Sequence, residues 1–354
     1  MKVNSSIRLV AFIIFGLLVF IIYLFLFIGF GDIIEVFRSV NPYEYAIYYS
    51  ITIIAMVLSM LFYTMSWNNL MEALSINIGL KRAFLYCWLG NFVDLIVPLE
   101  AVSGEITKIY LVNKEVKGSS GKIVASVVIH RIITTFITLS TLLLASVFFV
   151  LKYEVKAEIL YLLLLMIVGS LLLIASLLYL SIKEEATEKL IELPIKAVSF
   201  VMRKRLNLSD IKERARQSLI QYHSGFKIFG RNWGALMKSI TYSFISWLLH
   251  LNTYFLVFYA LGFNEISAKI YETVIVYSIS MATQTIPIAL PLGLVEIVMT
   301  SLYTLFNIPI AISGTATLLI RVVTFWLQIL IGYVIAQWMG VKNLLSRDAK
   351  ETLT

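Results

Sequence analysis

The chain is poor in the residues on which metal sites and disulfide-linked domains depend. Among its 354 residues there are one cysteine, Cys87, and three histidines. A single thiol excludes a disulfide within the chain and a thiolate metal cluster. The histidines, His130, His223 and His250, lack the spacing of a ligand set, so we expect neither a metal nor a cofactor.

Motifs of catalysis and nucleotide binding are also missing. The sequence contains no GxxxxGK[ST] loop, no GxGxxG turn before a helix, no HExxH helix and no GxSxG elbow. ATP-driven pumping by this chain alone is therefore not expected. We predict a transporter-like protein and not an enzyme.

Charged residues are scarce, and apolar residues take their place. Charged residues make up 14% of the chain and hydrophobic residues 60%, with a mean hydropathy of +0.89. A typical soluble domain carries about 25% charge. Several runs approach about 20 apolar residues, enough to cross roughly 30 Å of hydrocarbon. We predict an all-α, polytopic membrane protein with a single membrane domain, 1–354, and six full spans at 9–30, 44–66, 123–150, 159–181, 238–261 and 312–338.

Two further regions are apolar but interrupted. Residues 84–113 are broken at Pro98, and residues 271–306 at Pro287 and Pro291. Neither region suits one continuous span, because proline removes a backbone donor and kinks a helix. We predict two re-entrant hairpins that turn at these prolines.

Basic residues predict the orientation. The net charge of +8 gathers in a few polar loops, as in cytoplasmic loops beside anionic lipid, and this placement argues against a nucleic-acid partner. All these loops are cytoplasmic together only if hairpin 84–113 enters from the cytoplasm and hairpin 271–306 from outside. We expect a plasma-membrane protein with both termini cytoplasmic and with membrane lipids as partners.

The one sizeable polar segment is 182–238, which mixes apolar helical positions with many basic residues. We interpret it as cytoplasmic, surface-lying amphipathic helices that connect two halves of the protein. The alternative is a docking surface for a glycosyltransferase or another lipid-modifying enzyme.

The two broken regions match each other in spacing. A proline precedes a glycine by six residues in both, in the pairs Pro98–Gly104 and Pro287–Gly293. An arginine follows the glycine after 27 residues in the first region and 28 in the second. A glutamate and that arginine complete each copy: Glu105 and Arg131, then Glu296 and Arg321. This order indicates inverted repeats of four plus four elements, in halves 1–150 and 159–338, and such repeats are typical of transporters.

Arg131 and Arg321 lie in helices that otherwise suit hydrocarbon. A charge at the centre of a bilayer costs at least ~2.5 kcal/mol, so both side chains should face the interior and have partners. Glu105 and Glu296 are the candidates. One interpretation is a pair of buried salt bridges with a purely structural role. The other is that the guanidinium groups also bind a mobile phosphate, for which arginine offers paired donors.

The hairpins add to a possible anion site. Each returning arm would begin a short helix near Ser103–Gly104 or near Gly293, with free N–H groups pointing to the middle of the bilayer. Asn91 and Asp94 share one face of the first arm. Asp94 is either a proton-coupling carboxylate or a partner of Lys108.

Other polar residues in the apolar runs have simpler interpretations. We expect Thr324 and Gln328 to form hydrogen bonds between helices, and His130 to pack. Asp32 and Glu35 support an enzyme alternative, in which the pair serves a glycosyltransferase that uses lipid-linked sugars. The preferred interpretation of that pair is the start of an amphipathic surface helix.

Two stretches resemble the signatures of a known family. They are "VPLEAVSGEITKIYLVNKEVKGSSGKIVASVVIHRI" and "PIALPLGLVEIVMTSLYTLFNIPIAISGTATLLIRVVTF". The pattern of Pro, Gly and Glu followed by a helical Arg is similar to that of the lysylphosphatidylglycerol synthase transmembrane-region family, also called flippase-like or UPF0104 proteins. The chain departs from it at Leu292, where a glycine is usual, and at Ser103.

The resemblance implies a free-standing member without a synthase domain. Family members include the membrane half of bacterial enzymes that aminoacylate phosphatidylglycerol, and members linked to polyprenyl-phosphate sugars. We therefore predict a lipid flippase or scramblase that moves an anionic, phosphate-bearing lipid without ATP hydrolysis. The resemblance places the following residues at motif positions: Pro98, Gly104, Glu105, Arg131, Pro291, Gly293, Glu296 and Arg321.

Overall fold

A computed structural model describes residues 29–97, 102–153, 157–185, 187–188, 208–284 and 293–340, together with Ile22 and Phe25. These residues form helices and connections without a strand, as predicted for an all-α protein. The helices are α2 Phe30–Ser39, α3 Pro42–Ala73, α4 Leu80–Ile96, α5 Ser103–Glu115, α6 Ser120–Lys152, α7 Ala157–Ile182, α9 Leu208–Arg231, α10 Trp233–Ala260, the 3-10 helix η2 Asn264–Ala268, α11 Ile270–Gln284, α12 Leu294–Leu305, α13 Ile310–Arg321, the π-helical turn η3 Val322–Trp326 and α14 Leu327–Trp338.

Five segments of the described chain are long and apolar enough to cross a membrane. They coincide with five of the six spans expected from the sequence, and they make this a multi-pass integral membrane protein. The sixth expected span, 9–30, lies almost wholly outside the described residues. The five are Pro42–Ala73, Ser120–Lys152, Leu163–Ile182, Trp233–Ala260 and Ile310–Trp338.

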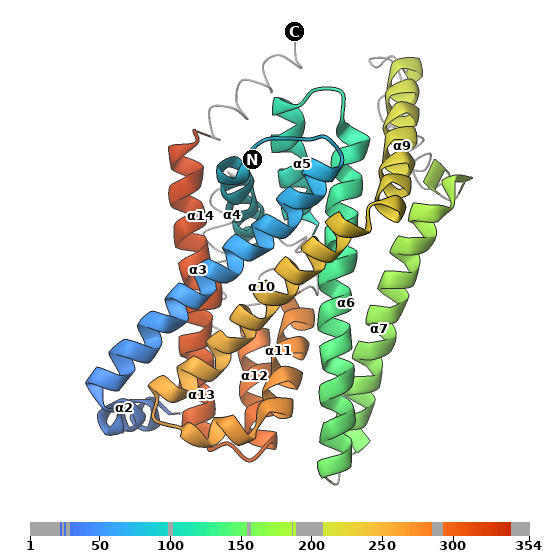
Figure 1. Cartoon of the computed structure of the whole chain (residues 1–354). Helices are drawn as coiled ribbons and strands as arrows, with labels where there is room; N and C mark the ends of the chain where they lie inside the picture. Colours follow the sequence, from blue (N-terminus) through green and yellow to red (C-terminus); the bar gives the residue numbers. More distant parts are fainter. Residues whose placement is uncertain are drawn as a thin grey trace, which may run out of the picture.

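Helices α3 and α10 run antiparallel and side by side across the bundle (Figure 1). Small hydroxyl residues line their contact at a seven-residue spacing. The Oγ of Ser59 donates to the carbonyl of Ser246 at 2.9 Å, and the Oγ of Ser246 donates back at 2.8 Å. Ser66 and Ser239 make the same reciprocal pair at 3.0 and 3.1 Å. Small side chains let the two backbones approach, and the hydroxyl groups hold them together without water.

The two crossing helices also begin and end alike. Asn41 caps α3 and Asn232 caps α10, each through its side-chain oxygen. Each helix is followed by a residue in the left-handed conformation, Ser75 with φ 62° and Gly262 with φ 75°. These residues turn the chain sharply into the next element, because the left-handed residue lets the amide after it bond back into the last turn.

Four pairs of elements correspond at a nearly constant offset. Their starting residues lie 190 or 191 positions apart: Pro42 and Trp233, Leu80 and Ile270, Ser103 and Leu294, Ser120 and Ile310. In Figure 1 the short helices α4 and α5 lie in one half of the bundle, and α11 and α12 lie in the other. Each broken region is thus a pair of short helices.

The turns of the two broken regions lie outside the described residues, and with them Pro98, Pro287, Pro291 and Leu292. The described chain stops at Val97 after α4 and resumes before α5, which begins at Ser103. The second break likewise falls between the end of α11 and Gly293.

Helices α7 and α9 stand at the side of the bundle (Figure 1). Only 6% of the most apolar stretch of α7 is buried inside the protein. The main contacts of α7 are with α6 and α9. Within the polar segment 182–238, the sequence predicted several helices lying on the surface. The structure has one long helix, α9, packed along α6, and residues 189–207 lie outside the described chain.

Candidate functional site

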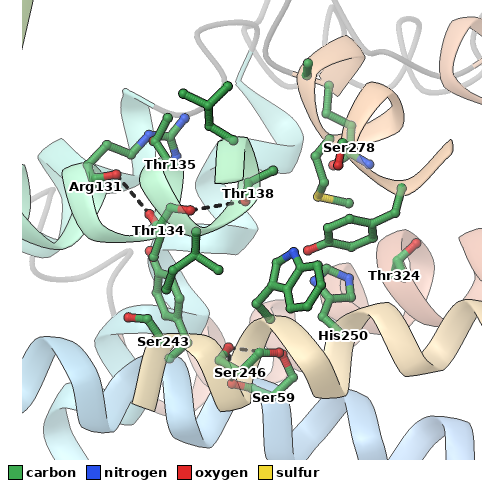
Figure 2. A pocket seen from close by; sticks show the side chains of 18 of the residues that line it. Ser59, Arg131, Thr134, Thr135, Thr138, Ser243, Ser246, His250, Ser278 and Thr324 are labelled. Atoms are coloured by element: carbon green, nitrogen blue, oxygen red, sulfur yellow. Dashed lines mark hydrogen bonds between the residues drawn. The ribbon is translucent and has the colours of Figure 1, made fainter. Parts of the chain in front are cut away.

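A cavity of about 360 Å³ lies at the centre of the bundle (Figure 2). Helices α3, α6, α10 and α11 supply most of its lining, with further residues from α4, α7, η3 and α14. Its polar lining residues are Ser59, Tyr63, Asn91, Asp94, Arg131, Thr134, Thr135, Thr138, Ser170, Ser243, Ser246, Trp247, His250, Tyr277, Ser278, Gln284, Thr324 and Gln328. A polar cavity inside helices that cross hydrocarbon is suited to a polar group that would otherwise stay at the membrane surface.

Arg131 lines this cavity from α6, as the sequence predicted. Its guanidinium group makes no hydrogen bond and no ion pair with another residue of the described chain. Thr134 and Thr138 lie along the same face of α6, and their hydroxyl groups donate to carbonyls of their own helix at 3.1 Å. The α6 wall therefore offers one unpaired cation beside hydroxyl oxygens that remain free to accept (Figure 2).

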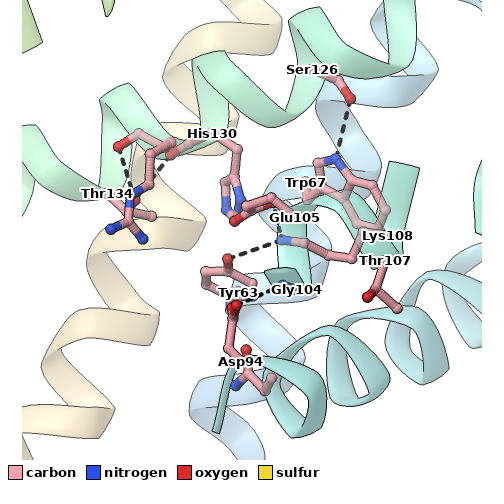
Figure 3. Close-up of polar contacts among 12 residues, drawn as sticks. Tyr63, Trp67, Asp94, Gly104, Glu105, Thr107, Lys108, Ser126, His130 and Thr134 are labelled. Carbon is pink, nitrogen blue, oxygen red and sulfur yellow. Dashed lines mark hydrogen bonds and ion pairs between the residues drawn. The ribbon is translucent and has the colours of Figure 1, made fainter. Parts of the chain in front are cut away.

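The N-terminus of α5 is closed by an acid from the neighbouring helix. Asp94 Oδ1 accepts hydrogen bonds from the Ser103 hydroxyl at 2.9 Å and from the Gly104 backbone N–H at 2.6 Å (Figure 3). The expectation of a free anion site at Ser103 and Gly104 is therefore wrong. A helix N-terminus carries partial positive charge, and Asp94 already neutralises it.

The N-terminus of α12 is closed in the same manner. The backbone N–H of Gly293 donates to Glu296 Oε2 at 2.7 Å, across three residues of the same helix start. The predicted anion site at Gly293 is thus also occupied by the chain's own carboxylate. In both broken regions a carboxylate accepts from a backbone N–H group that would find no acceptor in hydrocarbon.

Glu105 pairs with Lys108 and not with Arg131. The Lys108 Nζ lies 2.7 Å from Glu105 Oε2, one helical turn away, and 3.3 Å from the hydroxyl group of Tyr63 (Figure 3). Lys108 is only 3% exposed, and its ammonium group lies 5.2 Å from the ring centroid of Trp67. This corrects the predicted Glu105–Arg131 pair, and it excludes Lys108 as the partner of Asp94.

The second glutamate does pair with its arginine, as predicted. Arg321 Nε lies 2.6 Å from Glu296 Oε1, and both residues are 1% exposed. The guanidinium carbon lies 4.5 Å from the ring centroid of Phe325, while Nη1 and Nη2 have no hydrogen-bond partner within the described chain. Arg321 does not line the cavity, so its expected place in a common passage is not seen here.

The two copies differ at a position that bears on this pairing. Lys108 lies three positions after Glu105, whereas Met299 lies three positions after Glu296. A lysine in the first copy satisfies the glutamate locally and leaves Arg131 unpaired. The thioether of Met299 in the second copy cannot neutralise a carboxylate, and Glu296 forms its ion pair with Arg321.

Several other predicted residues can now be placed. Asn91 and Asp94 line the cavity, and Asn91 Nδ2 lies 3.5 Å from Gln328 Oε1, so Gln328 does bond between helices. Thr324 does not, because its hydroxyl group donates to the carbonyl of Ile320 within its own helix at 2.9 Å. His130 is buried and packs on Tyr63, with ring centroids 4.4 Å apart.

The acid pair of the enzyme alternative lies elsewhere. Asp32 and Glu35 are exposed on α2, an amphipathic helix whose Ile33 is buried, and neither lines the cavity. This agrees with the surface-helix interpretation.

Sequence reasoning missed the wall that faces Arg131. Trp247 and His250 of α10 and Ser278 of α11 line the cavity, beside the serines of the α3–α10 contact. Single residues of these types in apolar runs form no recognisable motif, so the sequence did not identify them as part of a site. The seven-residue spacing of Ser59 and Ser66 against Ser239 and Ser246 was the signal that could have identified the contact.

Known proteins resemble this chain over most of its length. The family model described as lysylphosphatidylglycerol synthase TM region matches residues 10–332. A UPF0104 membrane protein of Methanothermobacter thermautotrophicus is 24% identical over 317 residues, which cover 89% of this chain and 91% of the relative. One of Methanocaldococcus jannaschii is 25% identical over 318 residues, 89% of this chain and 90% of the relative. One of Pyrococcus horikoshii is 24% identical over 291 residues, 80% and 84% respectively. No solved structure matches the chain.

Proposed function

The chain belongs to the family of the lysylphosphatidylglycerol synthase transmembrane region, and from that premise we propose that it is a lipid flippase or scramblase. It moves an anionic, phosphate-bearing lipid between leaflets without hydrolysing ATP. The lipid is a phospholipid or carries a polyprenyl-phosphate-linked head group. The observation that carries this proposal is the unpaired guanidinium group of Arg131 in a polar cavity of the membrane-spanning bundle.

An unpaired arginine at this depth needs an anion. A central charge costs at least ~2.5 kcal/mol on insertion scales, and no carboxylate of the described chain compensates Arg131. A phosphate diester fits this requirement, because its two free oxygens match the paired N–H donors of a guanidinium group. The lipid tails would remain in the hydrocarbon while the head group occupies the cavity.

The path across the membrane follows from the paired elements. We interpret α4–α5 and α11–α12 as re-entrant hairpins of two inverted repeats, the first entering from the cytoplasm and the second from outside. The constant offset of the helix starts supports this interpretation, as do the opposite halves of the bundle that the hairpins occupy (Figure 1). In this topology Arg131 serves the passage between the hairpins, and the Arg321–Glu296 pair closes the half beyond it.

Replacing Arg131 tests the proposal directly. In liposomes that contain acyl-labelled phosphatidylglycerol, Arg131→Gln should slow lipid movement at least about tenfold, the loss expected for a hydrogen bond to a charged group. The readout is the fraction of label that dithionite added outside quenches over time.

Arg82→Gln is the matched control. It removes the same charge from an exposed pair with Glu115, in which the Arg82 side chain is 63% exposed, and it should leave the rate unchanged. A folded Arg131→Gln protein that moves lipid at the wild-type rate would refute the proposal.

A further inference from the structure

The wall of the cavity opposite Arg131 contains polar atoms without partners. Trp247 Nε1, His250 Nε2 and Ser278 Oγ are buried and form no hydrogen bond with the described chain. All three residues line the cavity from α10 and α11. Figure 2 shows Ser278 and His250 on the side of the cavity away from Arg131 and Thr134.

Four other hydroxyl groups that line the same cavity have hydrogen-bond partners. Ser59 and Ser246 bond to each other across α3 and α10, and Thr134 and Thr138 bond within α6. Ser278, by contrast, is 2% exposed and unpaired. Buried polar groups are nearly always paired, so each orphan group requires an explanation. Three orphan groups on one wall of a cavity indicate a ligand that supplies their partners.

The chemistry of this wall is neutral. An indole N–H donates, a hydroxyl group donates and accepts, and an imidazole does either according to its tautomer. Aromatic rings surround these groups: Tyr277 lies 6.2 Å from Trp247 and 5.5 Å from His250 between ring centroids. Apolar and aromatic surfaces with a few placed polar groups are typical of sites for small polar molecules.

Among the residues that the structure describes, no carboxylate lies on this wall. The acid that lines the cavity is Asp94, and its Oδ1 already accepts from Ser103 and Gly104. Uncharged hydroxyl groups suit the wall better, because each donates and accepts at once, as Ser278 and the imidazole require.

We infer that the α10–α11 wall, formed by Trp247, His250 and Ser278, binds the uncharged, hydroxyl-bearing part of the transported head group while Arg131 binds its phosphate. This assignment rests on the proposed function and makes it more specific. The favoured substrate is a phosphodiester lipid whose head group carries free hydroxyl groups. A site built to bond hydroxyl groups discriminates against an analogue that lacks them, since its own polar atoms are then left unpaired.

Two lipids of nearly equal shape test the inference. Phosphatidylglycerol carries two head-group hydroxyls, and phosphatidylpropanol has the same charge and none. Wild-type protein should bind and move phosphatidylglycerol in preference to phosphatidylpropanol. Trp247→Phe and Ser278→Ala should each reduce that preference by about two- to tenfold, the effect of one neutral hydrogen bond. Binding is measured by native mass spectrometry and movement by dithionite quenching in liposomes.

Matched controls use the same substitutions outside the cavity. Trp88→Phe removes another orphan indole N–H, from α4, and Ser280→Ala removes a hydroxyl group of α11 that bonds to the Val276 carbonyl at 2.6 Å. Neither residue lines the cavity, and both variants should keep the wild-type preference.

The outcomes separate the two hypotheses. Arg131→Gln should reduce the binding and movement of both lipids equally. The wall variants should reduce the binding and movement of phosphatidylglycerol only. If wild-type protein binds and moves both lipids alike, or if the wall variants keep the preference, the inference is wrong. If the protein binds phosphatidylglycerol selectively through the wall but moves neither lipid, the inference holds and the proposed transport activity fails.

Discussion

At the scale of single residues, Lys108 marks the difference between the two glutamate–arginine motifs. It neutralises Glu105 at 2.7 Å, and Arg131 remains unpaired. In the second copy Met299 stands in its place, and Glu296 holds Arg321 at 2.6 Å. The same glutamate–arginine motif therefore gives an unpaired arginine in one copy and a buried ion pair in the other.

Lys108→Met should convert the first copy to the state of the second. Glu105 would lose its partner, and Arg131 is a cation nearby, since Lys108 bonds to Tyr63 and Tyr63 lines the same cavity as Arg131. An uncompensated buried charge is costly, so Glu105 should attract Arg131. We expect lipid movement in liposomes to fall to about the level of Arg131→Gln, at least about tenfold.

A double variant separates this effect from simple loss of structure. Lys108→Met with Glu105→Gln removes both charges, so Arg131 should again be unpaired and lipid movement should recover. Detergent melting temperatures would show that both proteins are folded. A double variant as inactive as the single one would contradict the role given to Lys108.

The sequence predicted these residues better than it predicted their partners. Arginines in apolar helices are conspicuous, and the Arg321–Glu296 pair followed from their spacing. The Glu105–Lys108 pair did not, because the repeated motif predicts Arg131 as the partner of Glu105, and Lys108 is expected only as a partner of Asp94. The capping of α5 by Asp94 depends on the packing of α4 against α5, which spacing alone does not determine.

At the scale of elements, the crossing of α4 and α5 depends on two glycines. A Cβ at Gly104 would overlap Asp94 Oδ2 and the carbonyl oxygen of Gly90, and one at Gly90 would lie 3.0 Å from the carbonyl oxygen of Gly104. The two short helices therefore touch through their backbones. This contact brings Asp94 to the N-terminus of α5.

Gly104→Ala should separate these helices. We expect a loss of about 1–3 kcal/mol, as for other overpacked sites, and a lower melting temperature in detergent. Gly169→Ala, in α7, is the control: a Cβ there meets no atom within 4 Å. Since alanine favours a helix over glycine by up to ~1 kcal/mol, this variant should be neutral or stabilised. Equal melting temperatures for the two variants would contradict the close packing of α4 on α5.

Element positions were the most predictable part of the fold. Hydropathy located the five described spans because each must bury a long apolar run. The π-helical turn after Arg321 was not predictable, since one extra residue in a turn leaves no mark on an apolar pattern. The orphan groups of the α10–α11 wall were also missed, because their meaning depends on the cavity they share.

At the scale of the whole molecule, the proposed topology puts the α5–α6 and α10–α11 connections on opposite sides of the membrane. They lie at opposite ends of the bundle (Figure 1), and Lys117 and Ser267 are exposed within them. Cys87 is buried, so Cys87→Ala gives a background without thiols. The distribution of basic residues predicts the orientation of the segments in the membrane. It does not predict the diagonal crossing of α3 and α10, because that crossing depends on side-chain packing.

Thiol labelling tests this arrangement. In intact cells a membrane-impermeant maleimide should label Ser267→Cys at once and Lys117→Cys only after permeabilisation. Labelling in detergent serves as the control for reactivity. Reaction of both cysteines from the same side would rule out the inverted arrangement.

Helix α7 adds little to the core, yet it sets the relation between the two halves. In the proposed topology the matched sets, α3 to α6 and α10 to α14, each cross the membrane an even number of times, because a returning hairpin adds no crossing. If a loop alone joined two such sets, both would have the same orientation in the membrane. Helix α7 adds one crossing in the proposed topology, so the second set begins on the opposite side of the membrane from the first. In the proposed topology a single, sparsely packed helix thus gives the two sets their opposite orientations.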